Sequence, residues 1–234
     1  MRYLRPLVGA VLLATLLAGC TSAPTPDGSV PDASAPGSAT TPPRAKPSAT
    51  PSAEPVNPLA AVTAIIVRPE NLDLNDTSGA TIRALSYDAE AADFVAALND
   101  ILGGEPTVTE FAGGMESSPW TQYDWAGVQV NDDHEANGER DMNLSVIFDS
   151  PSVGQSVSVA TIQGFQPGGD LAELAEWMDE PFTAGGYNQI QAERGPDIGP
   201  RQFDTYANAH SVTGQDFTGS TVIFAPWNFG IGHV

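Results

Sequence analysis

The sequence is poor in cysteine, in basic residues and in long hydrophobic runs. Cys20 is its only cysteine, so an intramolecular disulfide is impossible and a folded domain must be stable through its core alone. The longest apolar run, Leu7–Leu17, has 11 residues, whereas a membrane-spanning helix needs about 20. These shortages exclude a disulfide scaffold and dithiol redox chemistry, and they argue against a helical membrane anchor.

Basic residues are few, and no lysine follows Lys46. Of the 29 acidic residues, 26 follow residue 58, where they face five arginines, so this part of the chain has a net charge of −21. The arginines are Arg68, Arg83, Arg140, Arg194 and Arg201. A surface of this sign repels nucleic acid and anionic lipid. We therefore expect no nucleic-acid partner, whereas solubility, cationic partners or bound metal ions are compatible with such acidity.

Motifs of the common enzyme classes are missing. The sequence contains no G-x-S-x-G, S-x-x-K, H-E-x-x-H, Walker A or G-x-G-x-x-G motif. The histidines, which lie at no metal-ligand spacing from one another, are His134, His210 and His233. We expect a non-catalytic protein without a cofactor. The alternative is a cell-wall-directed hydrolase that uses paired carboxylates, for which Asp88 with Glu90 and Glu176 with Asp179 are candidates, although acids this numerous also fall close together by chance.

The N-terminal segment has the features of an export signal. Arg2 and Arg5 precede the apolar run, which has the length of a secretory h-region. The run ends in Leu17-Ala18-Gly19-Cys20, which resembles the lipobox of bacterial lipoproteins. This resemblance implies that residues 1–19 are a signal peptide and that Cys20 becomes a diacylglyceryl cysteine with palmitate. The mature protein would then be anchored by lipid to the outer, extracytoplasmic face of the cell membrane; an ordinary secretory peptide with a chance cysteine is the alternative.

A tether is expected to follow the lipidated cysteine. Residues 20–58 consist mainly of Pro, Ser, Ala, Thr and Gly, and such a composition cannot bury enough apolar surface to offset the entropy lost on ordering. As a coil it would span about 35 Å, and as extended polyproline II about 115 Å. Stalks of this kind resemble those of lipoproteins from high-GC Gram-positive bacteria. The chain as a whole resembles the many uncharacterised actinobacterial lipoproteins, a resemblance that implies no activity.

Residues 59–234 fit a single acidic globular domain. Strands are predicted at 62–68 and 80–87, joined by a polar loop, and further strands around 107–111, 121–130, 142–149, 156–165, 187–192, 204–212 and 220–227. A first amphipathic helix begins near Asp88 and stops at Gly103-Gly104. A second begins after Gly168-Gly169 with Asp170 as its cap. This pattern predicts an α+β fold with a mainly antiparallel sheet and two short amphipathic helices.

The two halves of the domain resemble each other in outline. An aspartate opens each helix, at Asp93 and Asp170, and Glu-Pro follows each, at Glu105-Pro106 and Glu180-Pro181. Two degenerate repeats and a chance likeness are both consistent with these offsets. The segment around residues 161–181 resembles the Gly-rich turn, helix and Pro of small envelope domains, such as the group of beta-lactamase-inhibitor protein and outer-membrane-assembly lipoproteins. Members of that group bind other proteins.

An acidic stretch, Asn131–Asp141, has some features of a calcium loop. The residues that match ligand positions or the central glycine are Asp133, Glu135, Asn137, Gly138, Glu139 and Asp141. The twelfth position is Leu144 in place of the bidentate glutamate, and the flanking segments read as strands and not helices. Because Asn-Gly also favours a two-residue hairpin turn, we interpret the stretch as an acidic hairpin and expect no dedicated metal site.

Aromatic residues supply the candidate binding surface. Trp120, Tyr123 and Trp125 follow one another closely in the sequence, and Trp227 lies in a Gly/Pro-rich C-terminal segment. Such rings either stack on sugars or peptides or belong to the core. Together with the lipobox and the tether, they lead us to expect a lipid-anchored extracytoplasmic binding or protein-interaction module. Its partners would be the membrane, through the lipid, and an envelope protein or wall polymer.

Overall fold

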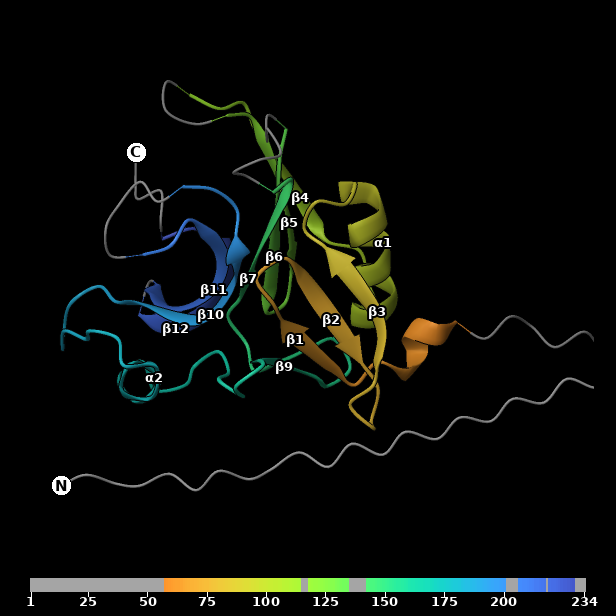
Figure 1. Cartoon of the computed structure of the whole chain (residues 1–234). Coiled ribbons are helices and arrows are strands. Elements are labelled where there is room, and N and C mark those ends of the chain that lie inside the picture. Colours follow the sequence, from red (N-terminus) through yellow and green to blue (C-terminus); the bar gives the residue numbers. More distant parts are fainter. Residues whose placement is uncertain (1–56, 115–117, 135–141, 201–205, 218, 230–234) are drawn as a thin grey trace, which may run out of the picture. The chain divides into compact units, whose positions relative to one another are not determined.

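The computed structural model describes residues 57–114, 118–134, 142–200, 206–217 and 219–229. All of them belong to one compact unit, Ala53–Val234 (Figure 1). The predicted signal peptide, Cys20 and almost all of the tether lie outside the described residues, as do Glu135, Asn137, Gly138, Glu139 and Asp141 of the acidic stretch. No described helix is long and apolar enough to cross a membrane.

A five-stranded sheet contains the first three strands of the chain and two later ones. After the short 3₁₀ helix η1 (Pro58–Ala61), it is built from β1 (Ala64–Val67), β2 (Asn71–Asn75), β3 (Thr81–Ser86), β8 (Ser152–Val153) and β9 (Val157–Thr161), in the order β3-β2-β1-β9-β8. Among the described strands, only β1 and β9 pair in parallel. The polar loop predicted between the first two strands is wrong, because β2 lies within it. Leu72 and Leu74 are fully buried on alternate positions of β2, a period of two that the surrounding polar residues conceal.

A seven-stranded antiparallel sheet forms the rest of the β structure. Its strands are β4 (Thr107–Phe111), β5 (Trp120–Trp125), β6 (Val128–Asp133), β7 (Leu144–Phe148), β10 (Gln189–Asp197), β11 (Ala209–Phe217) and β12 (Ser220–Trp227), in the order β10-β11-β12-β7-β6-β5-β4. The segment predicted as one strand at 121–130 belongs to two strands, since Gly127, with φ of 86°, turns the chain between β5 and β6.

Both predicted helices are present. α1 (Ala91–Leu102) begins three residues after Asp88 and buries Phe94, Leu98 and Ile101, and Gly103 ends it in the left-handed conformation. α2 (Leu171–Met178) is capped as predicted: the Asp170 carboxylate accepts hydrogen bonds from the backbone N–H groups of Ala172 and Glu173. The α+β class with mainly antiparallel sheets is therefore confirmed.

The seven-stranded sheet has an inner face, which is covered, and an outer face. On the inner face, buried residues of β6, β7 and β12 pack with the five-stranded sheet and α1 in one hydrophobic core. A smaller core joins α2 to Ile190 and Ala192 of β10. A meander follows each helix, β4–β7 after α1 and β10–β12 after α2, and the two meet where β7 pairs with β12. The internal repeat itself remains a prediction.

Candidate functional site

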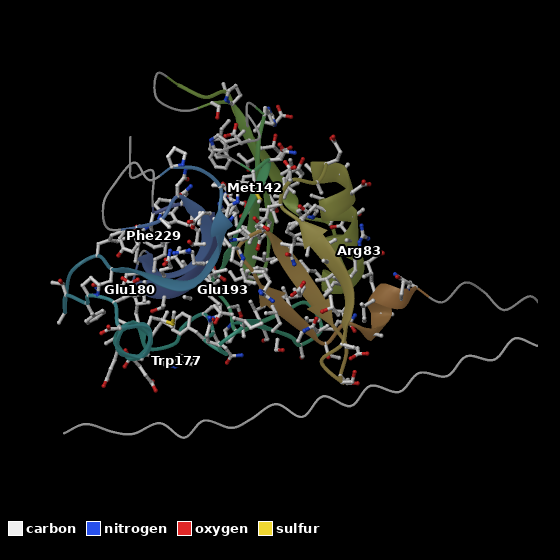
Figure 2. All side chains as sticks on the ribbon, viewed as in Figure 1. Arg83, Met142, Trp177, Glu180, Glu193 and Phe229 are labelled. Carbon is white, nitrogen blue, oxygen red and sulfur yellow. The ribbon has the colours of Figure 1, made fainter. Side chains whose placement is uncertain are left out.

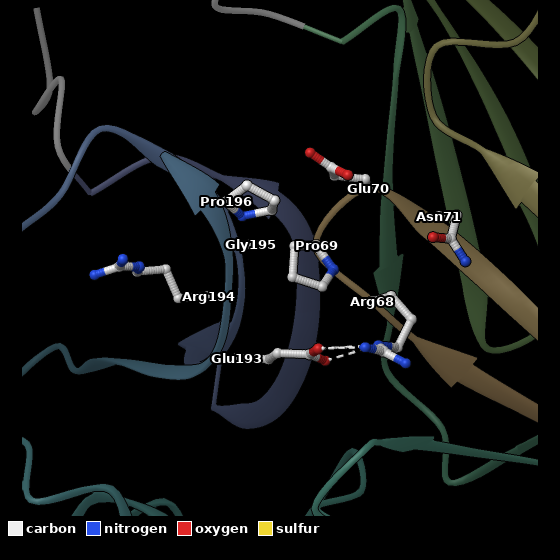
Figure 3. A pocket seen from close by; sticks show the side chains of 8 residues that line it. All are labelled: Arg68, Pro69, Glu70, Asn71, Glu193, Arg194, Gly195 and Pro196. Carbon is white, nitrogen blue, oxygen red and sulfur yellow. Dashed lines mark hydrogen bonds and ion pairs between the residues drawn. The ribbon is translucent and has the colours of Figure 1, made fainter. Parts of the chain in front are cut away.

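A polar cavity of about 440 Å³ lies between the β1–β2 connection and β10. Its lining residues are Arg68, Pro69, Glu70, Asn71, Glu193, Arg194, Gly195 and Pro196. Figure 3 shows Arg68 and Glu193 facing each other, whereas the side chain of Arg194 points away from them. Segments about 125 residues apart in the sequence thus meet at one site.

Arg68 is the centre of the hydrogen-bond network in this cavity. Its Nε donates to both carboxylate oxygens of Glu193, at 3.0 and 3.1 Å, and its Nη2 lies 2.8 Å from Oε1. Its Nη1 donates to Asp73 at 3.3 Å. The other carboxylate oxygen of Asp73 accepts a 2.7 Å hydrogen bond from the Asn71 amide. The planar guanidinium therefore connects carboxylates from both sheets in a fixed geometry.

Local backbone structure brings the two segments close together. The Arg68 N–H donates to the Asn71 carbonyl, which closes a tight connection between β1 and β2. On β10, Gly195 packs against Pro69: a Cβ at this glycine would lie 3.1 Å from the Pro69 Cβ and 3.2 Å from the His210 carbonyl oxygen. The pairing of β10 with β11 is irregular here, between Gln191 and Glu193. The irregularity turns Glu193 to the inner face, toward Arg68.

Burial changes the protonation energetics of this cluster. It raises the pKa of Glu193 above its ordinary value, an effect larger than the opposing hydrogen bond and charge of Arg68. For Arg68, burial alone lowers the pKa, but its hydrogen bonds and charge interactions with Glu193 and Asp73 raise it overall. The fully buried Tyr87 hydroxyl has a pKa well above its ordinary value because of burial and then because of the nearby charges of Asp73 and Glu193.

The carboxylates of the cluster are held by ion pairs. Glu193 and Asp73 are both engaged by one arginine, so neither carboxylate is positioned as a free general acid or base. The remaining acid of the lining, Glu70, is half exposed and lies 3.9 Å from Nδ1 of His210. Among the described residues no group of three or more His, Cys, Asp or Glu side chains is placed to hold a metal ion. The cavity presents charged and amide side chains, and Figure 2 labels one of them, Glu193 of β10.

The predicted aromatic surface does not converge. Successive residues of a strand point to opposite faces, so Trp120 lies on the outer face of β5 whereas Tyr123 and Trp125 lie on the inner face, partly buried against the core. The outer-face ring of Trp120 stacks on Phe111 with ring centres 3.9 Å apart. Trp227 lies three strands away, on β12, against Phe224 and Phe229. The spacing of these residues mixes odd and even strand positions, so Tyr123 and Trp125 belong to the margin of the core, and a binding role for the four aromatic residues stays a prediction.

The ends of the acidic stretch lie on a β-hairpin. β6 and β7 pair antiparallel with Asp132 opposite Leu144, which confirms strands and not helices on both sides. Asp133 is already engaged, since its carboxylate accepts a 2.7 Å hydrogen bond from the Ser118 hydroxyl. Burial raises the pKa of the neighbouring Asp132. Of the proposed ligands only Asp133 is described, so the turn between these strands remains a prediction.

Sequence reasoning did not find the cavity. The signal it could have used is Arg68, a rare base at the end of an apolar strand in an acidic domain. Its partner Glu193 is one acid among 26 in the domain, and only the tertiary fold selects it. Comparisons with protein families, with curated proteins and with solved structures found no match. The interpretation of the site therefore depends on its geometry.

Proposed function

We propose that this protein is a lipid-anchored binding or interaction module at the extracytoplasmic face of the cell membrane, with no catalytic activity of its own. The motif Leu17-Ala18-Gly19-Cys20 supports the location, and the Pro-rich residues that follow supply the reach to hold a domain away from the membrane. The observation that carries the binding role is the polar cavity lined by Arg68 and Glu193, in which Arg68 pairs with Glu193 and also with Asp73.

Paired charges of this kind favour recognition over chemistry. Proton transfer needs an acid or base that is free to reach the reacting atom, and here both carboxylates are engaged by the Arg68 guanidinium. The lining group that is most open to a partner is the Glu70 carboxylate, which is 46 % exposed, and the exposed Arg194 beside it, paired with Asp197, adds a positive charge. They suit a polar or zwitterionic segment of an envelope protein or wall polymer, bound by hydrogen bonds and charge.

Cell fractionation tests the anchor. The wild-type protein should sediment with membranes, and Cys20→Ala should appear in the soluble fraction because no other group in the proposal attaches the protein to lipid. A serine substitution at a tether position, Ala23→Ser, is the matched control and should leave the protein in membranes. Equal membrane association of Cys20→Ala and wild type would contradict the lipoprotein proposal.

Crosslinking in intact cells tests the binding role. Purification of the lipidated protein after crosslinking should recover a discrete envelope component, and recovery should fall for Glu70→Lys, which reverses a charge at the cavity mouth. Glu176→Lys on α2 makes the same change of net charge elsewhere and should not reduce recovery. Hydrolysis of purified wall polymer by the protein, lost in Glu193→Gln, would instead establish the enzyme interpretation.

A further inference from the structure

β4 forms an edge of the seven-stranded sheet and is uncovered along its whole length. All five of its residues, Thr107–Phe111, are exposed. Val108 is 53 % and Phe111 is 39 % exposed, although both side chains are apolar and belong to residue types that favour strands. An exposed, regular and partly apolar edge offers unpaired backbone groups to another chain.

The other three edges in the described part of the chain are protected. β8 has only two residues. β3 carries Arg83, and its pairing with β2 is irregular between Leu74 and Asn75. β10 contains Pro196 and two register irregularities. β4 by contrast pairs with β5 in unbroken register over all five residues, and it contains no proline, lysine or arginine.

The backbone of β4 has room for one more partner. Within the described residues, the only strand that pairs with Thr107–Phe111 is β5. In an antiparallel pair, alternate residues direct their N–H and C=O groups away from the partner strand. These outward groups are the ones that an added strand would use.

The charge of β4 and of the segments next to it in the sequence favours one class of partner. Residues 84–139 contain 12 acids and neither lysine nor arginine. Glu110 lies on β4 itself, and Asp124 lies on β5 opposite Thr107. A second copy of this acidic domain would bring like charges together at this edge, whereas a basic segment would neutralise them.

We infer that the β4 edge accepts an extended polypeptide segment rich in lysine or arginine, which adds to the sheet as an eighth strand. Backbone hydrogen bonds supply affinity in this mode of binding, and side chains at alternate positions supply specificity. On β4, one face of the sheet carries the side chains of Val108 and Glu110, and the opposite face carries those of Thr107, Thr109 and Phe111. Side chains of the added strand would lie beside them on the same two faces. The inference rests on the proposed binding function and names the class of partner for a surface distinct from the cavity.

The test uses the full mature chain and a short synthetic peptide in which lysine alternates with threonine and valine. Binding is measured by titration calorimetry, and hydrogen exchange is followed at the amides of Thr107–Phe111. The peptide should bind and slow exchange at alternate β4 amides by about tenfold or more. The same peptide with glutamate in place of lysine should do neither.

Charge and backbone variants locate the contact. Glu110→Lys should weaken the basic peptide about fivefold or more, whereas Glu176→Lys, with the same change of net charge on α2, should bind like wild type. Residues 108 and 109 are adjacent on β4, so the N–H group of one points toward β5 and that of the other points outward. Val108→Pro and Thr109→Pro each remove one of these two groups. The variant that loses the outward group should keep the wild-type melting temperature, and the peptide should no longer protect its β4 amides from exchange.

Three outcomes would overturn the inference: no binding of the basic peptide, binding without protection of β4, or equal weakening by Glu110→Lys and Glu176→Lys. A dimer in sedimentation with β4 protected in the absence of peptide would assign the edge to a second copy. Because the hydrogen-exchange measurement reads β4 alone, a lack of protection together with an intact envelope crosslink would reject this edge and leave the proposed function in place. A loss of the crosslink with normal peptide binding at β4 would reject the proposed function and leave the β4 site in place.

Discussion

Arg68 and Glu193 lie 125 residues apart in the sequence, and the Arg68 Nε is 3.0 and 3.1 Å from the two oxygens of the Glu193 carboxylate. The pair joins the β1–β2 connection of one sheet to β10 of the other. Glu193 is the more protected partner, with 14 % of its side chain exposed against 32 % for Arg68. Each partner therefore compensates a charge that the fold has partly removed from water.

Removal of the two partners should have unequal effects on stability. Arg68→Met leaves Glu193 and Asp73 partly buried and facing each other, so we expect it to lower the free energy of unfolding by about 1–3 kcal/mol. Glu193→Gln leaves Arg68 paired with Asp73 and should cost less than about 1 kcal/mol. Urea denaturation measures both. The double variant Arg68→Met/Glu193→Gln should be more stable than the sum of the single effects predicts.

An exposed ion pair supplies the control for this cycle. Arg194 and Asp197 are 46 % and 61 % exposed, with their atoms 3.0 Å apart. Arg194→Met should change the free energy of unfolding by no more than about 0.5 kcal/mol. Equal costs for Arg68→Met and Arg194→Met would show that the Arg68 cluster does not hold the sheets together.

Mild acid should stabilise the protein, in part through Glu193. Its pKa is raised on folding, mainly by burial, so the folded state binds the proton more tightly than the unfolded state. The contribution is fully present below the unfolded pKa and is lost as pH rises through the raised folded pKa. The melting temperature should therefore rise as pH falls from 7 toward the ordinary glutamate range, and it should rise less in Glu193→Gln.

Acid also relieves the repulsion among the many carboxylates of this domain, which likewise raises the melting temperature. A second variant separates this effect from that of Glu193. Asp197→Asn removes one exposed carboxylate and should keep the wild-type pH dependence. If acidification raises the melting temperature of Glu193→Gln as much as that of Asp197→Asn, burial of Glu193 is not the cause of the pH dependence.

The apolar stripes of both helices should be essential. Leu98 and Leu174 are 0 % and 2 % exposed, so Leu98→Asp or Leu174→Asp would bury a carboxylate without a partner and cost several kcal/mol, a large part of the ~5–15 kcal/mol that stabilises a domain. Ala96→Asp and Trp177→Asp introduce the same side chain at exposed positions of α1 and α2. These controls should remain folded and soluble, and thermal melting distinguishes the two sets.

Local patterns were sufficient to predict most elements. Both helices follow from their apolar spacing and end signals, Gly103 and Asp170, because these act within a few residues. β2 was missed because its buried leucines alternate with Asn71, Asp73 and Asn75, which read as a loop. The division of the strands between two sheets, and the parallel pairing of β1 with β9, depend on contacts nearly 100 residues apart and have no local signature.

The site was less predictable than the fold for the same reason. Trp120 and Trp125 were both candidates for a binding surface, and their odd spacing along β5 places them on opposite faces of the sheet. The Arg68 cluster needs an irregularity in β10 to direct Glu193 inward. Exposure of the β4 edge likewise depends on which strand ends the sheet, a property of topology and not of the residues of β4.

The acidic hairpin should not be a dedicated calcium site. Calcium needs about 6–8 oxygen ligands, two of them from a glutamate at the twelfth position of the loop. Here that position is Leu144, which is 1 % exposed and begins β7 in the core, and the first position, Asp133, is bound by Ser118. Millimolar calcium should raise the melting temperature slightly through the overall negative field, and magnesium should do nearly as well. Titration calorimetry decides the matter: one stoichiometric micromolar site that is abolished by Asp133→Ala, kept in Asp149→Ala and not matched by magnesium would make this a calcium-dependent binding protein.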